Sequence, residues 1–345
     1  TEENIASFKN QLKRVGVSID WSREVNTADP SYYKWTQWIF TQLFARGLAY
    51  QKEANQWWCP VDKTVLANEQ VVNGKCWRCE NDVVKKPMKQ WFFKITDYAD
   101  ALLEEIPALD WPDKIKTAQT NWIGRSQGAE VDFTIADRDD TLTVFTTRPD
   151  TIFGATYLVL APEHPMVAAL STDDAREAVM AYVDEAIKKS EIDRSNDTKE
   201  KTGVFTGSYA LNPATGEKIP IWVADYVLWG YGTGAIMAVP AHDERDFAFA
   251  EKFELPVVEV IEKPADNTEE CYHGEGILMN SEQFDGMATS EAREEIVAWL
   301  EQQGLGHSQV TYKMRDWLIS RQRYWGAPIP IIHCPDHGAV AVPEK

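Results

Sequence analysis

Long apolar runs, a basic start and an excess of positive charge are all missing from this sequence. No run of about 18 apolar residues occurs, which excludes a conventional membrane-spanning helix. No positively charged start precedes an apolar stretch, so the sequence predicts no secretion signal. The formal net charge is -19, so any contact with nucleic acid must use local basic residues rather than bulk attraction. We expect a soluble, acidic protein that does not associate with membranes.

Cysteine is scarce and clustered, with five residues in 345 positions. Without a secretion signal, this odd number favours metal binding or free thiols over disulfides, and the cytoplasm as the compartment. Sixteen residues separate Cys59 from Cys76-Trp-Arg-Cys79, which gives three thiolates at the spacing of a zinc ribbon. Asp62 occupies the position of the expected fourth cysteine, and a carboxylate can also bind zinc. Two interpretations stay open: a structural zinc site on Cys59, Cys76 and Cys79, or a knuckle that has lost its metal.

The chain is long enough for two or three domains, and 44% of its residues are hydrophobic. Its start is helical and aromatic, a β-rich pattern begins near Gly128, and aromatic and basic residues return near Thr311. A β-rich module therefore looks inserted into a host domain. The expected divisions are 1–50 in the host domain, 51–95 as a zinc-ribbon-like module, 96–125 as a return and linker, 126–311 as the inserted module, and 312–345 as a return to the host domain. The last division contains half of a second knuckle, Cys334-Pro-Asp-His337, for which no metal is predicted.

Local patterns predict the main helices and strands. Aromatic and apolar residues from Tyr32 to Leu48 recur at helical spacing after the start signal Asp29-Pro30. Alternation predicts strands over 89–95, 129–135 and 141–145, and the apolar run 221–228 predicts a buried strand. We also expect a short helix over 96–105, an amphipathic helix over 172–189 capped by Thr172 or Asp173, and a tight turn over 212–216.

Three threonine hydroxyls gather around the end of the strand predicted at 141–145. Thr146 and Thr147 end this strand, and Thr151 follows the turn that Pro149 makes. Threonine is a good strand former, so β propensity by itself explains the first pair. If Thr151 instead faces a pocket, its methyl and hydroxyl groups limit the size of the side chain that can enter. Both interpretations stay open for this segment.

Two carboxylates, Asp243 and Asp246, stand at the start of a predicted helix that follows Pro240. The structural interpretation makes Asp243 the N-cap and Asp246 the third helical residue, both satisfying backbone N–H groups. The functional interpretation leaves one carboxylate to bind an ammonium group through a charge-assisted hydrogen bond. His242 beside them is either a general base or, as is commoner for a lone histidine at a helix start, a hydrogen-bonding core residue.

Several motifs of this sequence resemble those of one family. They are Gln11–Val17, Asp20–Glu24, Tyr32–Trp38, Thr64–Val71, Trp122–Ser126, Thr146–Gly154, Tyr231–Ala235, Pro240–Asp246 and Ser320–Pro330. Together they are similar to the class I aminoacyl-tRNA synthetases for leucine, isoleucine and valine. They are most similar to bacterial leucyl-tRNA synthetases, since the isoleucine and valine enzymes differ after the threonine pair. The resemblance implies a multidomain fold of α/β and α+β parts: part of a Rossmann-like catalytic domain, a small zinc-ribbon-like module and an inserted β-rich editing domain.

The resemblance also implies an editing activity, in which a wrong amino acid such as norvaline or isoleucine is hydrolysed from the terminal ribose of tRNA(Leu). Asp246 would bind the α-ammonium group, and Thr151 would block the branched side chain of leucine. The other implied site residues are Thr146 and Thr147 beside the ester and the water, Met237 and Val239 as an apolar wall, Arg148 and Tyr231 near the terminal adenosine or its phosphate, and Asp243 beside the substrate. An activated ester requires only a positioned water, so the resemblance implies no catalytic metal and no covalent nucleophile.

The family's two signatures for adenylate formation, His-Ile-Gly-His and Lys-Met-Ser-Lys-Ser, are missing from this sequence. We therefore expect an internal fragment without synthetic activity, and ATP and magnesium are needed only by the parent enzyme. The implied partners are tRNA(Leu) through its acceptor end and, for the parent enzyme, leucine and ATP. A cytoplasmic monomer is expected.

Two alternative functions remain open at this point. One is the editing module of an isoleucyl- or valyl-tRNA synthetase, which would act on a different mischarged tRNA. The other is a non-catalytic zinc-ribbon module that binds RNA through its local basic residues. This second alternative predicts RNA binding that depends on metal and salt, without ester cleavage.

Overall fold

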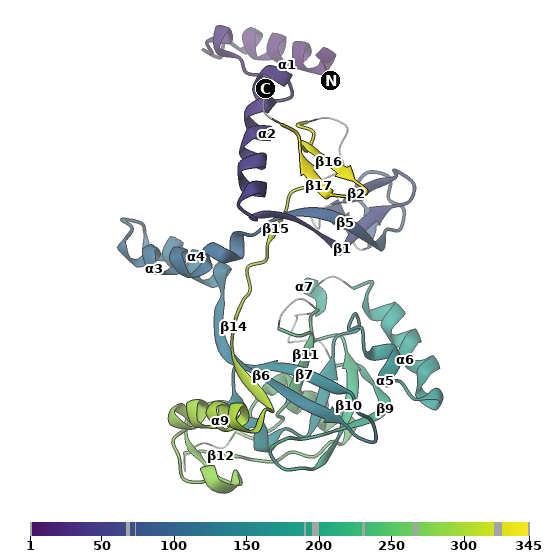
Figure 1. The fold of residues 1–345 in the computed structure, drawn as a ribbon, viewed down its shortest axis with the longest axis vertical. Coiled ribbons are helices and arrows are strands. Elements are labelled where there is room, and N and C mark those ends of the chain that lie inside the picture. The colour runs from purple at the N-terminus through teal and green to yellow at the C-terminus, as the bar shows by residue number, and fades with distance from the viewer. Residues whose placement is uncertain are drawn as a thin grey trace.

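The computed structural model describes residues 2–66, 70–72, 74–189, 191–194, 200–229, 232–264, 267, 269–320 and 326–343. Figure 1 shows an elongated molecule, with the N-terminal helices and a small sheet at one end and a larger β-rich body at the other. Within the described residues, no helix is both long and apolar enough to cross a membrane.

The N-terminal helices lead into a small antiparallel sheet. The structure has α1 over Glu2–Val15, the short helix η1 over Trp21–Arg23 and α2 over Pro30–Ala45. The Asp29 side chain caps α2 by accepting a hydrogen bond of 2.8 Å from the Ser31 N–H, as the start signal predicts. The sheet has the order β15-β5-β1-β2. Its strands are β1 (Ala49–Cys59), β2 (Thr64–Leu66), β5 (Val84–Phe93) and β15 (Trp317–Leu318), with the small pair β3 (Val71–Val72) and β4 (Lys75–Cys76) beside them.

A helical segment and two paired strands connect the two ends of the molecule. The helical segment consists of η3 (Ile95–Tyr98), α3 (Ala99–Glu105), η4 (Ile106–Ala108) and α4 (Asp113–Ile123). Strand β6 (Arg125–Ile135) leaves it, and β14 (Gly306–Tyr312) returns antiparallel to β6 (Figure 1). Asp100 of α3 anchors both strands, since it accepts hydrogen bonds from Arg125 at 3.2 Å and from the Tyr312 hydroxyl at 2.7 Å. The outward and return connections therefore run side by side.

The β-rich body is built on a seven-stranded sheet with the order β11-β8-β10-β9-β6-β14, in which β7 pairs with the other edge of β6. Its remaining strands are β7 (Thr141–Thr146), β8 (Tyr157–Leu160), β9 (Gly203–Leu211), β10 (Lys218–Ala224) and β11 (Ala235–Ala238). The helices around the sheet are η5 (Pro149–Gly154), α5 (Val167–Leu170), α6 (Asp173–Ala186), α7 (Glu191–Arg194), α8 (Glu244–Phe253), η6 (Glu282–Phe284) and α9 (Thr289–Gln303). The small pair of β12 (Ile261–Glu262) and β13 (Ile277–Leu278) also belongs to this body. The pair of β16 (Ile331–Cys334) and β17 (Gly338–Ala341) lies instead beside the small sheet at the other end of the molecule (Figure 1).

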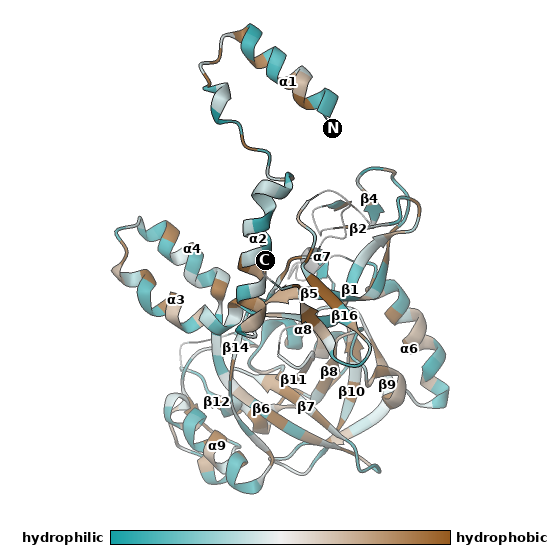
Figure 2. Cartoon of the chain, turned by 45° about the horizontal axis from the view of Figure 1, so that its top comes forward, coloured by the Kyte–Doolittle hydropathy of each residue, from teal (hydrophilic) through white to brown (hydrophobic). Residues whose placement is uncertain are grey.

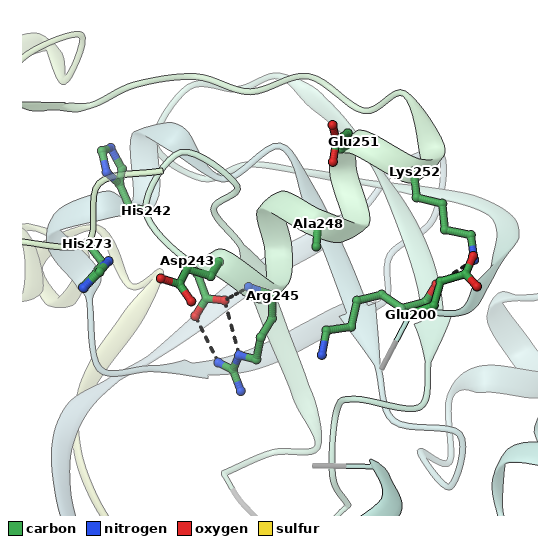
Figure 3. A pocket seen from close by; sticks show the side chains of 10 residues that line it. Glu200, His242, Asp243, Arg245, Ala248, Glu251, Lys252 and His273 are labelled. Atoms are coloured by element: carbon green, nitrogen blue, oxygen red, sulfur yellow. Dashed lines mark hydrogen bonds and ion pairs between the residues drawn. The ribbon is translucent and has the colours of Figure 1, made fainter. Parts of the chain in front are cut away.

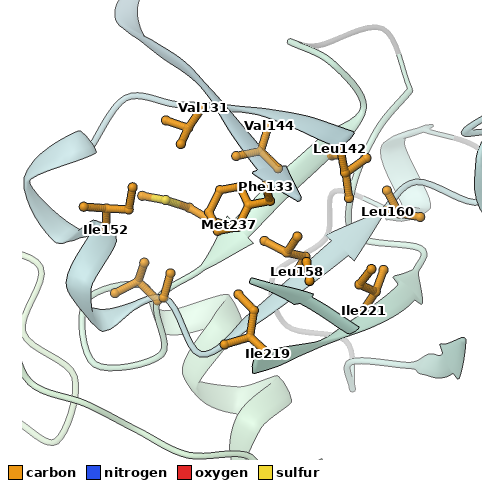
Figure 4. Close-up of a cluster of buried hydrophobic side chains, with 14 of the residues drawn as sticks. Val131, Phe133, Leu142, Val144, Ile152, Leu158, Leu160, Ile219, Ile221 and Met237 are labelled. Carbon is orange, nitrogen blue, oxygen red and sulfur yellow. The ribbon is translucent and has the colours of Figure 1, made fainter. Parts of the chain in front are cut away.

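The main hydrophobic core lies within this body. Strand β6 alternates as predicted: its Val131 and Phe133 side chains are buried in the core (Figure 4), and Ile135 is buried as well. Strand β8 is buried on both faces: Leu158 contributes to the main cluster and Val159 to a second cluster under α8. Figure 2 shows hydrophobic residues along β7 and β11 and mainly hydrophilic residues on α6 and α9, which therefore cover the body with polar outer surfaces.

The mixed α/β fold class with separate β-rich sheets is confirmed, and several local details differ from the prediction. The helix expected over 96–105 begins as the 3-10 helix η3 and becomes α3 only at Ala99, and the strand expected over 89–95 is the end of β5, which stops at Phe93. Helix α6 begins at Asp173, but the Thr172 side chain makes no capping hydrogen bond and contacts the Thr206 carbonyl instead. The strand expected at 221–228 ends at Ala224, because the chain turns away from the sheet at Asp225 and Tyr226. The turn at 212–216 forms as predicted. The division into modules stays a prediction.

Candidate functional site

The threonine-rich segment forms a tight turn where β7 ends. Gly128 of the neighbouring strand makes this approach possible, since a Cβ added there would lie 2.0 Å from the Thr146 carbonyl oxygen. The Thr146 hydroxyl accepts a hydrogen bond of 3.0 Å from the Arg148 N–H. The Thr151 hydroxyl donates a hydrogen bond of 2.9 Å to the Arg148 carbonyl, and this residue is 1% exposed. Thr147, by contrast, is exposed. The three threonines therefore occupy different environments, and only Thr151 is fixed in the interior.

A buried carboxylate, Asp150, ties this turn to the rest of the body. The side chain of Asp150 is fully buried, and its Oδ2 atom accepts a bond of 2.8 Å from the Arg148 guanidinium. Its Oδ1 atom accepts a bond of 3.2 Å from Arg293 of α9. Arg148 also donates to the His273 carbonyl at 3.2 Å. Through these ion pairs, Asp150 links the turn to α9.

The two aspartates at the start of α8 have different hydrogen-bond partners. Asp243 is the N-cap of α8, and its Oδ1 atom accepts hydrogen bonds of 2.9 Å and 3.2 Å from the N–H groups of Arg245 and Asp246. The Arg245 guanidinium also binds Asp243 at 3.0 Å. Burial opposes ionisation of Asp243, but these bonds outweigh it and lower the pKa of its carboxyl group. The capping interpretation is therefore confirmed for Asp243.

Asp246 is the third helical residue, but its carboxylate does not cap the helix. Its Oδ2 atom accepts a hydrogen bond of 2.9 Å from the Val239 N–H, and its Oδ1 atom accepts one of 3.0 Å from the Tyr226 hydroxyl. The residue is only 4% exposed. Burial and then the nearby charge of Asp243 raise the pKa of Asp246 to about 7. The second carboxylate is therefore held inside the body, at the cost of a large desolvation.

This perturbed pKa predicts a pH-dependent stability. A folded-state pKa near 7, above the ordinary value of 3.8, means that the protonated carboxyl favours folding, and that this contribution is lost as pH rises from about 4 through about 7. An amide at this position carries no charge at either end of that range. We therefore expect Asp246→Asn to have nearly the same Tm as the unsubstituted chain at about pH 4 and a higher Tm at about pH 8. Thermal unfolding at both values checks this, and an equal difference at the two pH values would contradict the burial of an ionised Asp246.

Val239 joins the threonine turn to the buried carboxylate. A Cβ added to Gly154, at the end of η5, would lie 3.3 Å from the Val239 Cγ1 atom, while the Val239 N–H binds Asp246. Val239 and Met237 are both buried members of the main hydrophobic cluster, and Figure 4 shows Met237 among the core side chains near Ile152. The structure thus places the end of η5 and the start of α8 beside the same residue, Val239, which directly follows β11.

His242 connects two backbone segments, at Tyr272 and at Val260, through its ring nitrogens. Its Nδ1 atom lies 2.6 Å from the Tyr272 carbonyl, and its Nε2 atom accepts a hydrogen bond of 3.0 Å from the Val260 N–H. These partners assign the proton to Nδ1 of a neutral ring. Burial lowers the pKa of His242, in agreement with this assignment. Both ring nitrogens are engaged, so the structural interpretation of this histidine is favoured over a general base.

An open cavity of about 820 Å³ lies along the outward face of α8 (Figure 3). Its lining includes Glu200, His242, Asp243, Arg245, Lys252 and His273. Asp246 is not among its lining residues, since its carboxylate points to the other side of the helix start, toward Tyr226 and Val239. Tyr231, the remaining predicted substrate-binding residue, lies outside the described residues.

The three predicted metal-binding cysteines lie close together, and Asp62, at the position of the expected fourth cysteine, lies beside them. One ligand atom from each of Cys59, Asp62, Cys76 and Cys79 lies within 4.8 Å of all the others, so this cluster could hold a metal ion. The Cys59 and Cys79 sulfur atoms are 3.4 Å apart, and Cys76 donates to Asp62 at 3.3 Å.

The backbone around this cluster has the geometry of two knuckles. The residue that follows each ligand pair is left-handed: Lys63 has φ 48° and Glu80 has φ 58°. Such non-glycine conformations are uncommon and require support from the surrounding structure. Cys334 lies 3.3 Å from His337, but no third ligand joins these two among the described residues.

Comparison with known proteins identifies the family. The family model described as leucyl-tRNA synthetase, editing domain, matches residues 120–301. The model of class I tRNA synthetases for isoleucine, leucine, methionine and valine matches residues 1–131. The chain belongs to the leucyl-tRNA synthetase family. The match of the inserted body to the leucyl model argues against the alternative of an isoleucyl or valyl editing module.

One solved structure agrees with this assignment. A leucyl-tRNA synthetase from Agrobacterium radiobacter, solved as a ternary complex with tRNA and LeuAMS, matches with 38% identity and a TM-score of 0.74. The match covers 99% of this chain and 40% of that enzyme, so the chain spans less than half the length of this relative. The methionyl-tRNA synthetase of Mycobacterium tuberculosis, solved with methionyl-adenylate, gives 18% identity and a TM-score of 0.26 over 34% of this chain and 24% of that one, too low to bear on the fold.

Three residues of this leucyl-tRNA synthetase body were missed by the sequence analysis. Asp150 stands two residues after Arg148, a spacing that already suggests an ion pair. Arg293 lies 143 residues from Asp150, and Tyr226 lies 20 residues from Asp246, with no pattern that links either pair. Only the packing of η5 against α9, and of the segment after β10 against α8, brings these residues together.

Proposed function

We propose that this chain hydrolyses the ester bond of tRNA(Leu) that carries a wrong amino acid, such as norvaline or isoleucine. The observation that carries this proposal is the buried Asp246 carboxylate, whose partner Val239 lies beside Gly154 at the end of η5, the short helix that contains Thr151. Its support is the match of residues 120–301 to the leucyl editing-domain model. A separate editing site is useful because binding alone separates side chains that differ by one methylene by only about 1–3 kcal/mol.

Asp246 is the proposed partner of the substrate's α-ammonium group. Each carboxylate oxygen can accept about two hydrogen bonds, and Oδ1 and Oδ2 each have one protein donor, from Tyr226 and Val239. Each oxygen therefore has the capacity to accept one more hydrogen bond, which we assign to the ammonium group. Because the carboxylate is buried, an ionic hydrogen bond there is much stronger than one in water.

The threonine turn supplies the proposed size limit and the position of the ester. Thr151 is held by its bond to the Arg148 carbonyl, so its methyl group cannot move aside for a branched leucine side chain. A positioned water is sufficient to attack an activated ester, and the neighbouring ribose hydroxyl can assist it. The remaining proposed contacts are Thr146 and Thr147 with the ester and the water, and Met237 and Val239 with the apolar side chain. Arg148 and Tyr231 are proposed to contact the terminal adenosine or its phosphate, and Asp243 to lie beside the substrate.

Deacylation of mischarged tRNA by the purified chain tests this function. We expect hydrolysis of norvalyl-tRNA(Leu) well above the spontaneous rate, and no comparable hydrolysis of valyl-tRNA(Ile). Binding of tRNA without ester cleavage, sensitive to metal and salt, would instead support a non-catalytic zinc-ribbon module. This chain spans 40% of the leucyl-tRNA synthetase from Agrobacterium radiobacter. We therefore propose the ATP- and magnesium-dependent joining of leucine to tRNA(Leu) for a longer parent enzyme and not for this chain alone. A monomer in the cytoplasm, which contacts the acceptor end of tRNA(Leu), is the proposed form.

We also propose that the metal cluster holds a structural zinc ion. Three thiolates and one carboxylate fit the ligand preferences of zinc, and Cys59 and Cys76 are buried, as ligands of a closed structural site usually are. Cys59 ends β1, and Cys76 ends β4. A bound zinc would therefore cross-link the loops of the small sheet and contribute to its folding.

Metal analysis and thermal unfolding test the zinc proposal. We expect about one zinc ion per purified chain, and a lower Tm after treatment with a chelator. Cys76→Ser should lose the metal and the response to the chelator, whereas Cys271→Ser, which changes a cysteine outside the cluster, should keep both. A metal-free chain whose Tm is insensitive to chelators would show that these knuckles work without zinc.

A further inference from the structure

The hydroxyl of Tyr226 donates a hydrogen bond to the buried Asp246 carboxylate. Tyr226 lies two residues after β10, is 7% exposed and packs its ring at 5.8 Å from Phe249 of α8. Its hydroxyl donates to Asp246 Oδ1 at 3.0 Å. A phenylalanine would fill the same space without a polar atom to satisfy, so ring packing does not explain the hydroxyl. The bond to Asp246 does.

A second buried tyrosine holds the same residue in a different way. The Tyr157 hydroxyl, from β8, donates to the backbone carbonyl of Asp246 at 2.9 Å. Tyr157 therefore fixes the helix start, and Tyr226 fixes the carboxylate itself. The Val239 N–H holds the opposite oxygen, Oδ2. With one donor on each oxygen, the rotation of the carboxylate about its Cβ–Cγ bond is fixed.

We propose that Tyr226 is a positioning residue of the editing site, which holds the Asp246 carboxylate in the orientation that leaves one acceptor position on each oxygen for the ammonium group. This proposal rests on the proposed function of the site. Tyr226 does not touch the substrate. Without its hydroxyl, Val239 alone would hold the carboxylate, which could then rotate and lose its fixed direction toward the ammonium.

The ionisation of Asp246 gives this role a distinct signature. Among the described residues, the titratable groups that act on Asp246 are Asp243 and Arg245 on α8, Tyr226 after β10, and Tyr157 and Cys271. Burial and Asp243 raise the pKa of Asp246 to about 7, while the bonds from Val239 and Tyr226 lower it. Loss of the Tyr226 hydroxyl therefore raises the pKa further, and less of the carboxylate is ionised at neutral pH.

The experiment compares Tyr226→Phe with the unsubstituted chain in the hydrolysis of norvalyl-tRNA(Leu) between about pH 6 and pH 9. We expect kcat/KM at about pH 7 to fall roughly tenfold, mainly through KM, because the carboxylate loses a hydrogen bond to its charged form and water replaces only part of it. The acid limb of the profile should move to higher pH by roughly one unit, and activity should recover toward the alkaline end.

Tyr182→Phe is the matched control. The Tyr182 hydroxyl lies 2.9 Å from the Thr202 carbonyl and accepts a bond of 3.0 Å from the Asp225 N–H, so it is a part-buried tyrosine hydroxyl in the same body that does not contact Asp246. Its loss should lower the Tm without moving the acid limb. A double-mutant cycle of Tyr226→Phe with Asp246→Asn, read as Tm at about pH 8, gives a measurement without tRNA, and we expect the two changes to be coupled.

The outcomes separate this role from the function of the site. If Tyr226→Phe keeps the wild-type kcat/KM and pH profile while Asp246→Asn is inactive, the positioning role is wrong and the editing function stands. A uniform loss at every pH, with no shift of the acid limb and additive effects on Tm, would make Tyr226 a purely structural residue and also overturn the role. If the unsubstituted chain leaves norvalyl-tRNA(Leu) intact, the proposed function itself fails.

Discussion

Asp246→Asn is expected to lower kcat/KM for hydrolysis of norvalyl-tRNA(Leu) by about 100-fold or more at about pH 8. Truncating one partner of a buried, hydrogen-bonded charge pair costs about 2–5 kcal/mol, most of it in binding that the substrate cannot recover elsewhere. The amide keeps the size of the side chain. It can still accept a hydrogen bond from Val239 and donate one to the Tyr226 oxygen, so the local structure should remain.

Two measurements separate this loss from unfolding. The Tm of Asp246→Asn should not be lower than that of the unsubstituted chain at the same pH, because the substitution removes a buried charge. Asp184→Asn removes a carboxylate from the exposed side of α6 in the same body and should leave hydrolysis unchanged. If Asp246→Asn retains hydrolysis, its carboxylate has only a structural role, and the ammonium must be bound elsewhere.

Thr151→Ala is expected to make the chain hydrolyse correctly charged leucyl-tRNA(Leu). Thr151 is buried, and its bond to the Arg148 carbonyl fixes the direction of its methyl group. Alanine removes both the methyl and the hydroxyl, which opens space for the branch of the leucine side chain. A steric limit of about one methyl group corresponds to about 10- to 100-fold, so the rate on leucyl-tRNA(Leu) should rise by that factor.

Two further substitutions separate size from hydrogen bonding at this position. Thr151→Val keeps the branched shape and loses the bond to Arg148, so it should still exclude leucine. Thr151→Ser keeps the bond and removes the methyl group, so it should admit leucine in part. Unchanged rates on leucyl-tRNA(Leu) in Thr151→Ala, measured beside norvalyl-tRNA(Leu) as a positive control, would show that another residue sets the size limit.

The local chemistry of the site could be read from the sequence because it depends on short spacings. The start of α8 at Asp243 follows from an N-cap residue before a helical pattern, and the structure confirms it. The convergence of Cys59, Asp62, Cys76 and Cys79 follows from two pairs of ligands, each with two residues between them. The end of β7 at Thr146 follows from alternation and from the Pro149 that comes after it.

What the sequence could not predict are the partners that lie across the fold. The sequence pattern treats Asp243 and Asp246 alike, as two carboxylates at a helix start. The structure gives them opposite environments: hydrogen bonds lower the pKa of Asp243, whereas burial raises that of Asp246. The difference arises because α8 packs on β8 and β11, so that the third helical residue faces Tyr226 while the cap faces the open cavity.

The amino-acid sequence by itself determined the family motifs, the helix and strand starts and the metal-ligand spacing, since each depends on residues within a few positions of one another. Only the tertiary structure decided that Asp246 is enclosed, that Tyr226 and Val239 hold its two oxygens, and that Arg293 reaches Asp150 from α9. A residue becomes buried, and therefore desolvated, only when helices and strands from distant parts of the chain pack around it. The same carboxylate therefore becomes a surface cap or a desolvated ligand for an ammonium group according to which side of α8 it occupies.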